Sequence, residues 1–260
     1  LQPVLPRDAL PLSWRGAESL AQAARGGWLG LLSSGWYLDH LRPAALHYAV
    51  DPHAGAVAEL PPEARERILG GEGCMWAEFV TPEMLDARLW PRAAAIAERL
   101  WSPPDRAQAD AAGLDDLYRR LGIFSLRLEE LGLRHRLDPR LMLQRLADGA
   151  VTPALAEFAA LLEPVKDYQR SGSGRYTQLT PLNRLVDAVA PESEAARAFG
   201  RTVDRFVERL GDREAGSAGG SAGVGTEPAT DARNELVRKL TAWRGDAAAG
   251  GELAAALAAS

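Results

Sequence analysis

Aromatic and acidic side chains stand close together at two places in the first third of the chain. Trp36 and Asp39 belong to the run Trp-Tyr-Leu-Asp, and Trp76 and Glu78 belong to the run Met-Trp-Ala-Glu. A sugar ring packs its face of C–H bonds on an aromatic plane, and its rim of hydroxyls hydrogen-bonds most strongly to an ionised carboxylate. The two runs therefore favour a carbohydrate-binding site.

The elements expected to position these residues alternate between strand and helix. Apolar runs at 10–14, 28–34 and 68–76 predict strands, and the second is continuous, as in a strand covered on both faces. Stretches of helical character at 17–25 and 84–101 follow the first and third strands. This alternation predicts parallel strands with helical crossovers. The active site of a parallel barrel lies at the carboxyl ends of its strands, where both aromatic and acidic runs fall.

From residue 114 onward the pattern is helical only, because apolar residues recur every three or four positions. The segments expected to be helical are 114–131, 141–146, 155–162, 182–189, 199–210 and 231–258. Residues 211–225 are rich in Gly, Ser and Ala, which predicts a flexible linker. We therefore expect two parts, one at residues 1–137 that contains the strands and a helical extension at 138–260.

Three motifs occur in a specific order along the first part. They are Tyr-Leu-Asp at 37–39, Trp-Ala-Glu at 76–78 and Trp-Pro-Arg at 90–92. Together they resemble the closing part of the barrel domain of family 20 glycoside hydrolases, the β-N-acetylhexosaminidases, over about residues 11–132. The resemblance implies an α/β fold: the C-terminal portion of a (β/α)8 TIM barrel, followed by a mostly α-helical extension.

The same resemblance implies an exo-acting hydrolase that removes terminal β-linked N-acetylglucosamine or N-acetylgalactosamine from a glycan or glycoconjugate. Its retaining mechanism is substrate-assisted: the substrate's acetamido oxygen attacks the anomeric carbon, and Tyr37 hydrogen-bonds that oxygen. Asp39 is assigned to hydroxyls near C4 and C6, and Glu78 chiefly to the hydroxyl at C4. Trp76 forms the apolar floor beneath the sugar, and Trp14 walls the N-acetyl pocket. The residues assigned to substrate binding are Trp14, Trp36, Asp39, Trp76 and Glu78.

One catalytic element of the family has no counterpart in the sequence. The family's acid/base pair is an Asp-Glu dipeptide, and none occurs among the 260 residues. The chain therefore looks like the C-terminal portion of a larger enzyme, whose N-terminal part is its expected partner, and we expect it to be inactive alone. Targeting information would precede residue 1, so periplasmic, secreted and cytoplasmic locations all stay open.

Other interpretations stay open beside this one. Without the resemblance, Tyr37 and Asp39 are a strand-end tyrosine and a helix-capping acid. Glu72 and Glu78 form an alternative acid and nucleophile pair, although Glu72 is expected to make a buried structural hydrogen bond. Ala44 stands where many relatives carry a further pocket tryptophan, so we expect either a wider acetamido pocket or another residue that fills this space. For the whole molecule, the alternatives are a catalytically inactive carbohydrate-binding or interaction module and a barrel glycosidase with two catalytic carboxylates.

Composition argues against several classes of protein. A formal net charge of −5, with arginines interspersed among acids, argues against nucleic acid as a partner. The four histidines are scattered without Cys or carboxylate at ligand spacing, and no phosphate-binding or dinucleotide-binding loop occurs, so we expect neither metal nor cofactor. Cys74 is the only cysteine, which excludes a disulfide within the chain. No apolar run approaches the roughly 20 residues of a membrane span.

Overall fold

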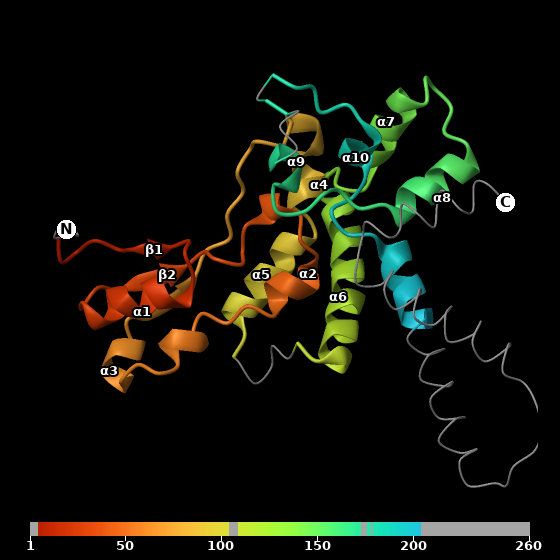
Figure 1. Ribbon diagram of the computed structural model, residues 1–260. Coiled ribbons are helices and arrows are strands. Elements are labelled where there is room, and N and C mark those ends of the chain that lie inside the picture. Colours follow the sequence, from red (N-terminus) through yellow and green to blue (C-terminus); the bar gives the residue numbers. More distant parts are fainter. Residues whose placement is uncertain (1–4, 104–108, 173–175, 178, 204–260) are drawn as a thin grey trace, which may run out of the picture. The chain divides into compact units, whose positions relative to one another are not determined.

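The computed structural model of the chain describes residues 5–103, 109–172, 176–177 and 179–203 (Figure 1). The linker expected at 211–225 and the helices expected at 231–258 lie outside the described residues, as does most of the helix expected at 199–210. None of the helices in the described ranges combines the length and the apolar composition needed to cross a bilayer.

Contacts between residues divide the chain into two units, Leu1–Ser193 and Glu194–Ser260. The fold described below is that of the first unit. It includes part of the helical extension that the sequence predicts, and helices from both sides of residue 137 pack on one another within it. The division into parts at 1–137 and 138–260 stays a prediction.

A small parallel sheet occupies the N-terminal part of the unit. Its strands, in spatial order, are β1 (Leu12–Ser13), β2 (Gly30–Leu32) and β3 (Ile68–Gly71). The register aligns Leu12 with Leu31 and Gly30 with Ile68. Helix α1 (Ala17–Arg25) connects β1 to β2, so the predicted parallel strands with a helical crossover are confirmed. Each paired strand is shorter than the apolar run that predicted it.

Short helical segments fill the connection from β2 to β3 and follow β3. They are η1 (Leu38–His40), α2 (Ala44–Tyr48), η2 (Gly55–Val57), α3 (Pro62–Arg65), η3 (Pro82–Met84), α4 (Leu85–Leu89) and α5 (Arg92–Trp101). The sequence predicts one helix at 84–101, whereas the structure interrupts it at Trp90–Pro91, a cis peptide bond. Proline has no N–H with which to continue the hydrogen-bond ladder, so α4 and α5 are separate helices.

The main hydrophobic core lies between the sheet and the helices beside it. Leu20 of α1, Leu32 of β2 and Ile96 of α5 are buried in one cluster with Trp36. A Cβ atom at Gly71 of β3 would lie 1.8 Å from the Trp36 indole. A side chain at position 71 would therefore displace the indole, and glycine allows the strand to pass this close to it.

The remaining described helices of the first unit come after residue 110. They are α6 (Ala111–Glu130), α7 (Leu137–Leu146), α8 (Pro153–Leu161), α9 (Gln169–Gly172) and α10 (Leu185–Ala188). The helical segments predicted at 114–131, 141–146 and 155–162 correspond to α6, α7 and α8, whereas the segment at 182–189 contains only the short α10. One buried cluster joins α6 to α2 and α5, and another joins α7 and α10 to η3.

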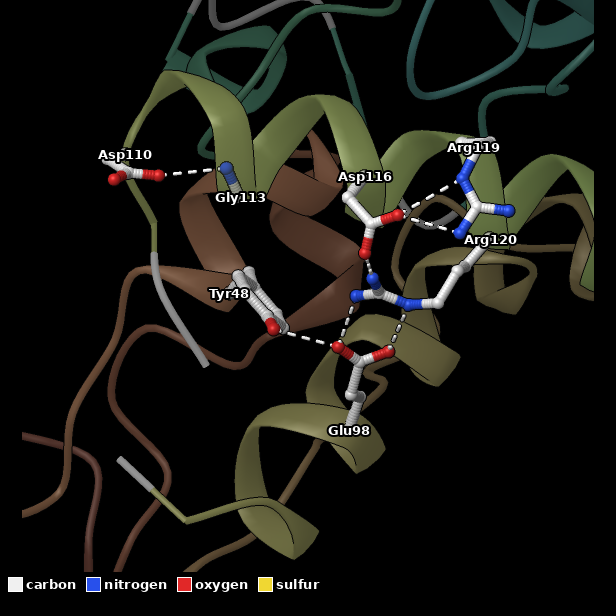
Figure 2. A network of polar contacts seen from close by, with 7 residues as sticks. All are labelled: Tyr48, Glu98, Asp110, Gly113, Asp116, Arg119 and Arg120. Carbon is white, nitrogen blue, oxygen red and sulfur yellow. Dashed lines mark hydrogen bonds and ion pairs between the residues drawn. The ribbon is translucent and has the colours of Figure 1, made fainter. Parts of the chain in front are cut away.

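Polar side chains also hold α6 on α2 and α5 (Figure 2). Glu98 of α5 accepts a hydrogen bond from the Tyr48 hydroxyl at 2.7 Å and pairs with Arg120 of α6 at 2.5 Å. Arg120 also pairs with Asp116, one turn earlier on α6. The Asp110 side chain caps the first turn of the same helix. These contacts hold α2, which lies between β2 and β3 in the chain, against α5 and α6, which follow β3.

Candidate functional site

The chain segments that leave β2 and β3 continue side by side beyond the sheet. Tyr37 and Cys74 form an isolated parallel bridge. The Leu38 N–H donates to the Cys74 carbonyl at 2.8 Å, and the Cys74 N–H donates to the Trp36 carbonyl at 2.9 Å. Because the two segments are hydrogen-bonded, the residues that follow them reach the same end of the sheet.

Asp39 and Glu78 meet at this end through a residue that the sequence reasoning missed. One oxygen of the Asp39 carboxylate accepts the Trp76 N–H at 3.1 Å, and the other accepts the hydroxyl of Tyr168. The Tyr168 hydroxyl also lies 3.1 Å from a carboxylate oxygen of Glu78. A single phenol therefore joins the two acids to which the family resemblance gives the sugar hydroxyls.

The turn that carries Tyr168 is fixed to η1 by several contacts. The Asp167 N–H donates to the His40 carbonyl at 3.1 Å, and the Asp167 carboxylate accepts from the Arg42 guanidinium at 2.6 Å. The Tyr168 ring packs against the His40 ring and against Phe79, with centroids 5.4 and 5.7 Å apart. Asp167 and Tyr168 both have a positive φ, 53° and 59°. This conformation costs a residue with a side chain roughly 1–2 kcal/mol, so the contacts, and not local preference, place the phenol.

The phenol of Tyr168 is held in its protonated form. Burial raises the pKa of Tyr168, and its hydrogen bond to Asp39 and the charges of Asp39 and Glu78 raise this pKa further. A neutral O–H between two carboxylates is a permanent donor at physiological pH. It stabilises two acids that would otherwise repel each other across a short distance.

Tyr37 immediately precedes η1, which carries Asp39. Its ring stacks on His40 with centroids 5.3 Å apart, and its hydroxyl lies 3.5 Å from the Ser33 hydroxyl. Burial also raises the pKa of the neighbouring Cys74 thiol, in agreement with a thiol that packs rather than reacts. The structure therefore brings Tyr37 to the same strand ends as the acids, with a different set of contacts.

The aromatic residues assigned to sugar binding differ in their exposure. Trp76 is 58% exposed and Trp14 is 62% exposed, with the Arg15 guanidinium 4.8 Å from the Trp14 ring centroid. Trp36 has no exposed surface, and its indole N–H donates to the His47 carbonyl at 2.9 Å. Successive residues of an extended segment point to opposite sides, so Tyr37 points away from the core that Trp36 enters. The structure thus does not bring Trp36 to a position where it contacts a sugar.

Two further expectations are corrected by burial. Glu72 is exposed, so its expected buried hydrogen bond is wrong, and its backbone N–H continues the ladder by donating to Leu32. Ala44 has no exposed surface and packs in the cluster that joins α2, α5 and α6. A larger side chain there would meet the helices rather than line a pocket in the described part of the chain.

A buried arginine supports the backbone of the segment that carries Asp39. Arg92, the first residue of α5, donates to the carbonyls of Leu38 at 2.9 Å and Arg42 at 2.8 Å, and also to that of Arg88. Leu38 and Arg42 bracket Asp39, so Arg92 fixes the segment that carries this acid. Burial lowers the pKa of Arg92 to about 9, which leaves the guanidinium charged at neutral pH.

A small cavity lies on the inner side of Tyr168. Its lining includes Asp39, Phe79, Arg88, Tyr168 and Asp187, and its volume is about 10 Å³. That volume accommodates roughly one water molecule, far less than a hexose needs. No cluster of three or more metal-ligating side chains occurs within the described residues.

Comparison with known proteins identifies the first part of the chain. Residues 2–104 match the family model described as glycosyl hydrolase family 20, catalytic domain. The chain carries part of a family 20 catalytic domain.

Curated proteins with similar sequences are named as subunits of β-hexosaminidase. The α subunit of β-hexosaminidase from Bos taurus is 37% identical over 131 residues, which are 49% of this chain and 23% of the relative. The β subunit from Felis catus is 35% identical over 119 residues, which are 45% of this chain and 21% of the relative. The chain therefore spans less than a quarter of the length of these curated relatives.

The family 20 likeness also reaches the helical part of the chain. The X-ray structure of Flavobacterium johnsoniae chitobiase is similar to this chain, with a TM-score of 0.72 and 38% sequence identity. The aligned region covers 80% of this chain and 32% of the chitobiase chain. This share of the chain exceeds residues 2–104, so helices after the family 20 segment have counterparts in the chitobiase. Tyr168 lies beyond that segment, in a stretch without apolar periodicity, and no local signal in the sequence points to it.

Proposed function

We propose that this chain is the sugar-holding part of an exo-β-N-acetylhexosaminidase of family 20. Its relatives are named β-hexosaminidases and chitobiase, and the matched segment contains the candidate site. The observation that carries the proposal is that Asp39, Trp76 and Glu78 lie together at the ends of two neighbouring parallel strands. Within the proposal, the three strands are the closing part of a (β/α)8 barrel, which has its active site at this end.

In the proposed reaction, terminal β-linked N-acetylglucosamine or N-acetylgalactosamine is removed with retention. The acetamido oxygen of the substrate attacks the anomeric carbon, so the protein supplies no carboxylate nucleophile. Tyr37 hydrogen-bonds the acetamido oxygen as charge develops on the amide. An internal nucleophile held in line avoids much of the entropic cost of bringing two molecules together.

The remaining residues of the proposed site hold the sugar. The exposed indole of Trp76 supplies an apolar surface for the C–H face of the ring, and Trp14 walls the N-acetyl group. Glu78 and Asp39 accept hydrogen bonds from the hydroxyls at C4 and C6. Each carboxylate oxygen has two lone pairs, so the contact between Asp39 and Tyr168 leaves acceptor capacity for a hydroxyl.

Glu78 and Glu72 provide a matched test of this assignment, because they are exposed acids on the same segment. In the full-length protein that contains this chain, we expect Glu78→Gln to lower kcat/KM on an aryl β-N-acetylglucosaminide by roughly 10- to 100-fold. This corresponds to the loss of one charged hydrogen bond, about 1.5–3 kcal/mol. Glu72→Gln should have nearly wild-type kinetics.

Two outcomes of this assay contradict the proposal. Equal kinetics for Glu78→Gln and the wild type would remove Glu78 from the site. Abolition of activity by both variants would instead favour a mechanism in which Glu72 and Glu78 act as acid and nucleophile, since such a pair needs both carboxyls.

The second candidate is a catalytically inactive carbohydrate-binding module derived from such a domain. The observation that favours it is the lack of an Asp-Glu dipeptide among the 260 residues. The two candidates differ in one measurement on the full-length protein. A module binds an aryl β-N-acetylglucosaminide without releasing the aryl group, whereas the enzyme releases it.

A further inference from the structure

Tyr168 contacts both acids of the proposed site, although it lies outside the matched family 20 segment. Its hydroxyl donates to Asp39, which is only 5% exposed, and lies 3.1 Å from Glu78. The two acids themselves come from different connections, one after β2 and one after β3. The phenol is therefore a direct link between the two halves of the site.

The surroundings of Tyr168 leave little freedom to the phenol. The ring is held between His40 and Phe79, and the preceding Asp167 binds Arg42 and the backbone of His40. A hydroxyl on a rigid aromatic ring loses little conformational freedom when it binds two partners. These contacts describe a group that is held at a defined place rather than a side chain that happens to touch the site.

The chemistry of a phenol suits this place. A phenol has one O–H to share between the two carboxylates. Each carboxylate oxygen has two lone pairs, so both acids keep acceptor capacity for sugar hydroxyls. A sugar presents several hydroxyls with a fixed stereochemistry, and C4 epimers place one of them on opposite faces of the ring. Acceptors held at a fixed spacing discriminate between such epimers better than acceptors that move independently.

We propose that Tyr168 is a positioning residue that sets the spacing of Asp39 and Glu78 and thereby determines selectivity at C4 of the terminal sugar. This inference rests on the proposed function, and it assigns a role to a residue of the helical part of the chain. The phenol makes the two acids one hydroxyl-binding unit. Without its O–H, Glu78 loses its link to Asp39 and to η1.

The test compares Tyr168→Phe with Tyr176→Phe in the full-length protein. Both changes remove one phenolic hydroxyl from the same region. The Tyr176 hydroxyl, however, accepts from the Arg170 guanidinium at 2.7 Å and makes no hydrogen bond to Asp39 or Glu78 in the described part of the chain. Phenylalanine at 168 keeps the packing on His40 and Phe79. Kinetics are measured on aryl β-N-acetylglucosaminide and aryl β-N-acetylgalactosaminide, and binding of the two free sugars is measured by isothermal titration calorimetry.

For Tyr168→Phe we expect KM for the preferred substrate to rise about 5- to 10-fold while kcat changes less than about twofold, as for a group that binds rather than reacts. The ratio of kcat/KM between the two substrates should move toward unity. Tyr176→Phe should keep both the KM and the ratio. If the substitution affected stability alone, the variant would have a lower melting temperature and an unchanged ratio of kcat/KM between the two substrates.

Several results overturn the inference while the proposed function stands. One is an unchanged KM and ratio in Tyr168→Phe with an active wild type. Another is a lower KM, which would show that the phenol competes with the sugar for the acids. If the wild type hydrolyses neither substrate, the proposed enzyme function fails, and sugar binding then tests the role of Tyr168. Weaker and less selective binding by Tyr168→Phe than by the wild type supports this role. Equal binding by the two proteins, or no binding by either, overturns it.

Discussion

His47 is a buried titratable residue behind the candidate site. It has no exposed surface, and its Nδ1 lies 2.7 Å from the carbonyl oxygen of Gly35. A carbonyl only accepts, so Nδ1 carries the proton, and the buried Nε2 has no partner within the described structure. Burial lowers the pKa of His47 to about 4 despite the bond to Gly35, and the charges of Arg92 and Arg42 act in the same direction as burial.

We predict that acidification from about pH 6.5 to about pH 4 destabilises the protein through His47. In this range the unfolded chain binds a proton at His47 that the folded chain does not, so the free energy of unfolding falls as the pH falls. The displacement of the pKa from 6.5 to about 4 corresponds to roughly 3 kcal/mol at the acid end of the range. Urea unfolding at a series of pH values measures the effect.

The informative comparison is between the wild type, His47→Asn and His53→Asn. His53 is exposed, so its replacement should leave the pH dependence unchanged. Asparagine at 47 keeps a donor for the Gly35 carbonyl and cannot titrate, so this variant should lose roughly 3 kcal/mol less than the wild type between the two pH values. Parallel curves for all three proteins would contradict the role assigned to His47.

At the scale of elements, α5 supports the segment that carries Asp39. Its first residue, Arg92, donates to the carbonyl of Leu38, where η1 begins, and to that of Arg42, which follows η1. Glu98, nearly two turns later, holds the same helix to α2 through Tyr48 and to α6 through Arg120, as Figure 2 shows. The helix that follows β3 therefore positions an acid that follows β2.

Replacement of Arg92 by methionine should loosen this support. Arg92→Met leaves the Arg42 carbonyl without the Arg92 donor and the Leu38 carbonyl with the Leu41 N–H alone. A buried unsatisfied acceptor costs about 1–3 kcal/mol. Removal of a buried charge offsets part of this loss, so we expect the free energy of unfolding to fall by roughly 2 kcal/mol. In the full-length protein, KM should rise because Asp39 is no longer held.

Arg119→Met on α6 is the control for this change. Arg119 pairs with Asp116 at 2.7 Å on the surface, and such a pair contributes only about 0–1 kcal/mol. Chemical denaturation of the two variants distinguishes the roles of the two arginines. If Arg92→Met were as stable as Arg119→Met and had an unchanged KM, η1 would not depend on α5.

At the scale of the molecule, the described sheet has two outer strands. β1 and β3 each pair with β2 only, within the described residues, and Leu12 of β1 and Leu69 of β3 are exposed. Unpaired strand edges and exposed apolar side chains favour association with further strands. The proposed barrel would supply such strands, so we expect these edges to be covered in the complete domain.

We predict that the 260-residue chain by itself has no useful turnover on an aryl β-N-acetylglucosaminide. It contains no Asp-Glu dipeptide, and proton transfer to the leaving group commonly contributes 10²- to 10⁴-fold to the rate. The full-length protein, assayed at equal molar concentration, should release the aryl group readily. Brisk hydrolysis by the chain alone would show that another group delivers the proton.

Parts of the fold and of the candidate site could be predicted from the sequence because they depend on local patterns. Continuous apolar runs predict the strands, and carboxyl ends of parallel strands share one edge, so Asp39 and Glu78 could be expected to meet. The side to which Trp36 points could not be predicted in this way. Its neighbour Tyr37 has an equally aromatic side chain, and only the packing against Gly71 decides which of the two is buried.

By itself, the sequence determined the family 20 motifs, the alternation of strands and helices, and the lack of an Asp-Glu pair in these residues. The tertiary structure alone decided that Tyr168 joins Asp39 to Glu78 from 129 and 90 positions away along the chain. A hydrogen bond depends on distance in space, and the course of the chain through α6, α7 and α8 brings these residues together. Periodicity and local composition depend only on residues that are close along the chain, so they cannot predict the contact of Tyr168 with Asp39 and Glu78.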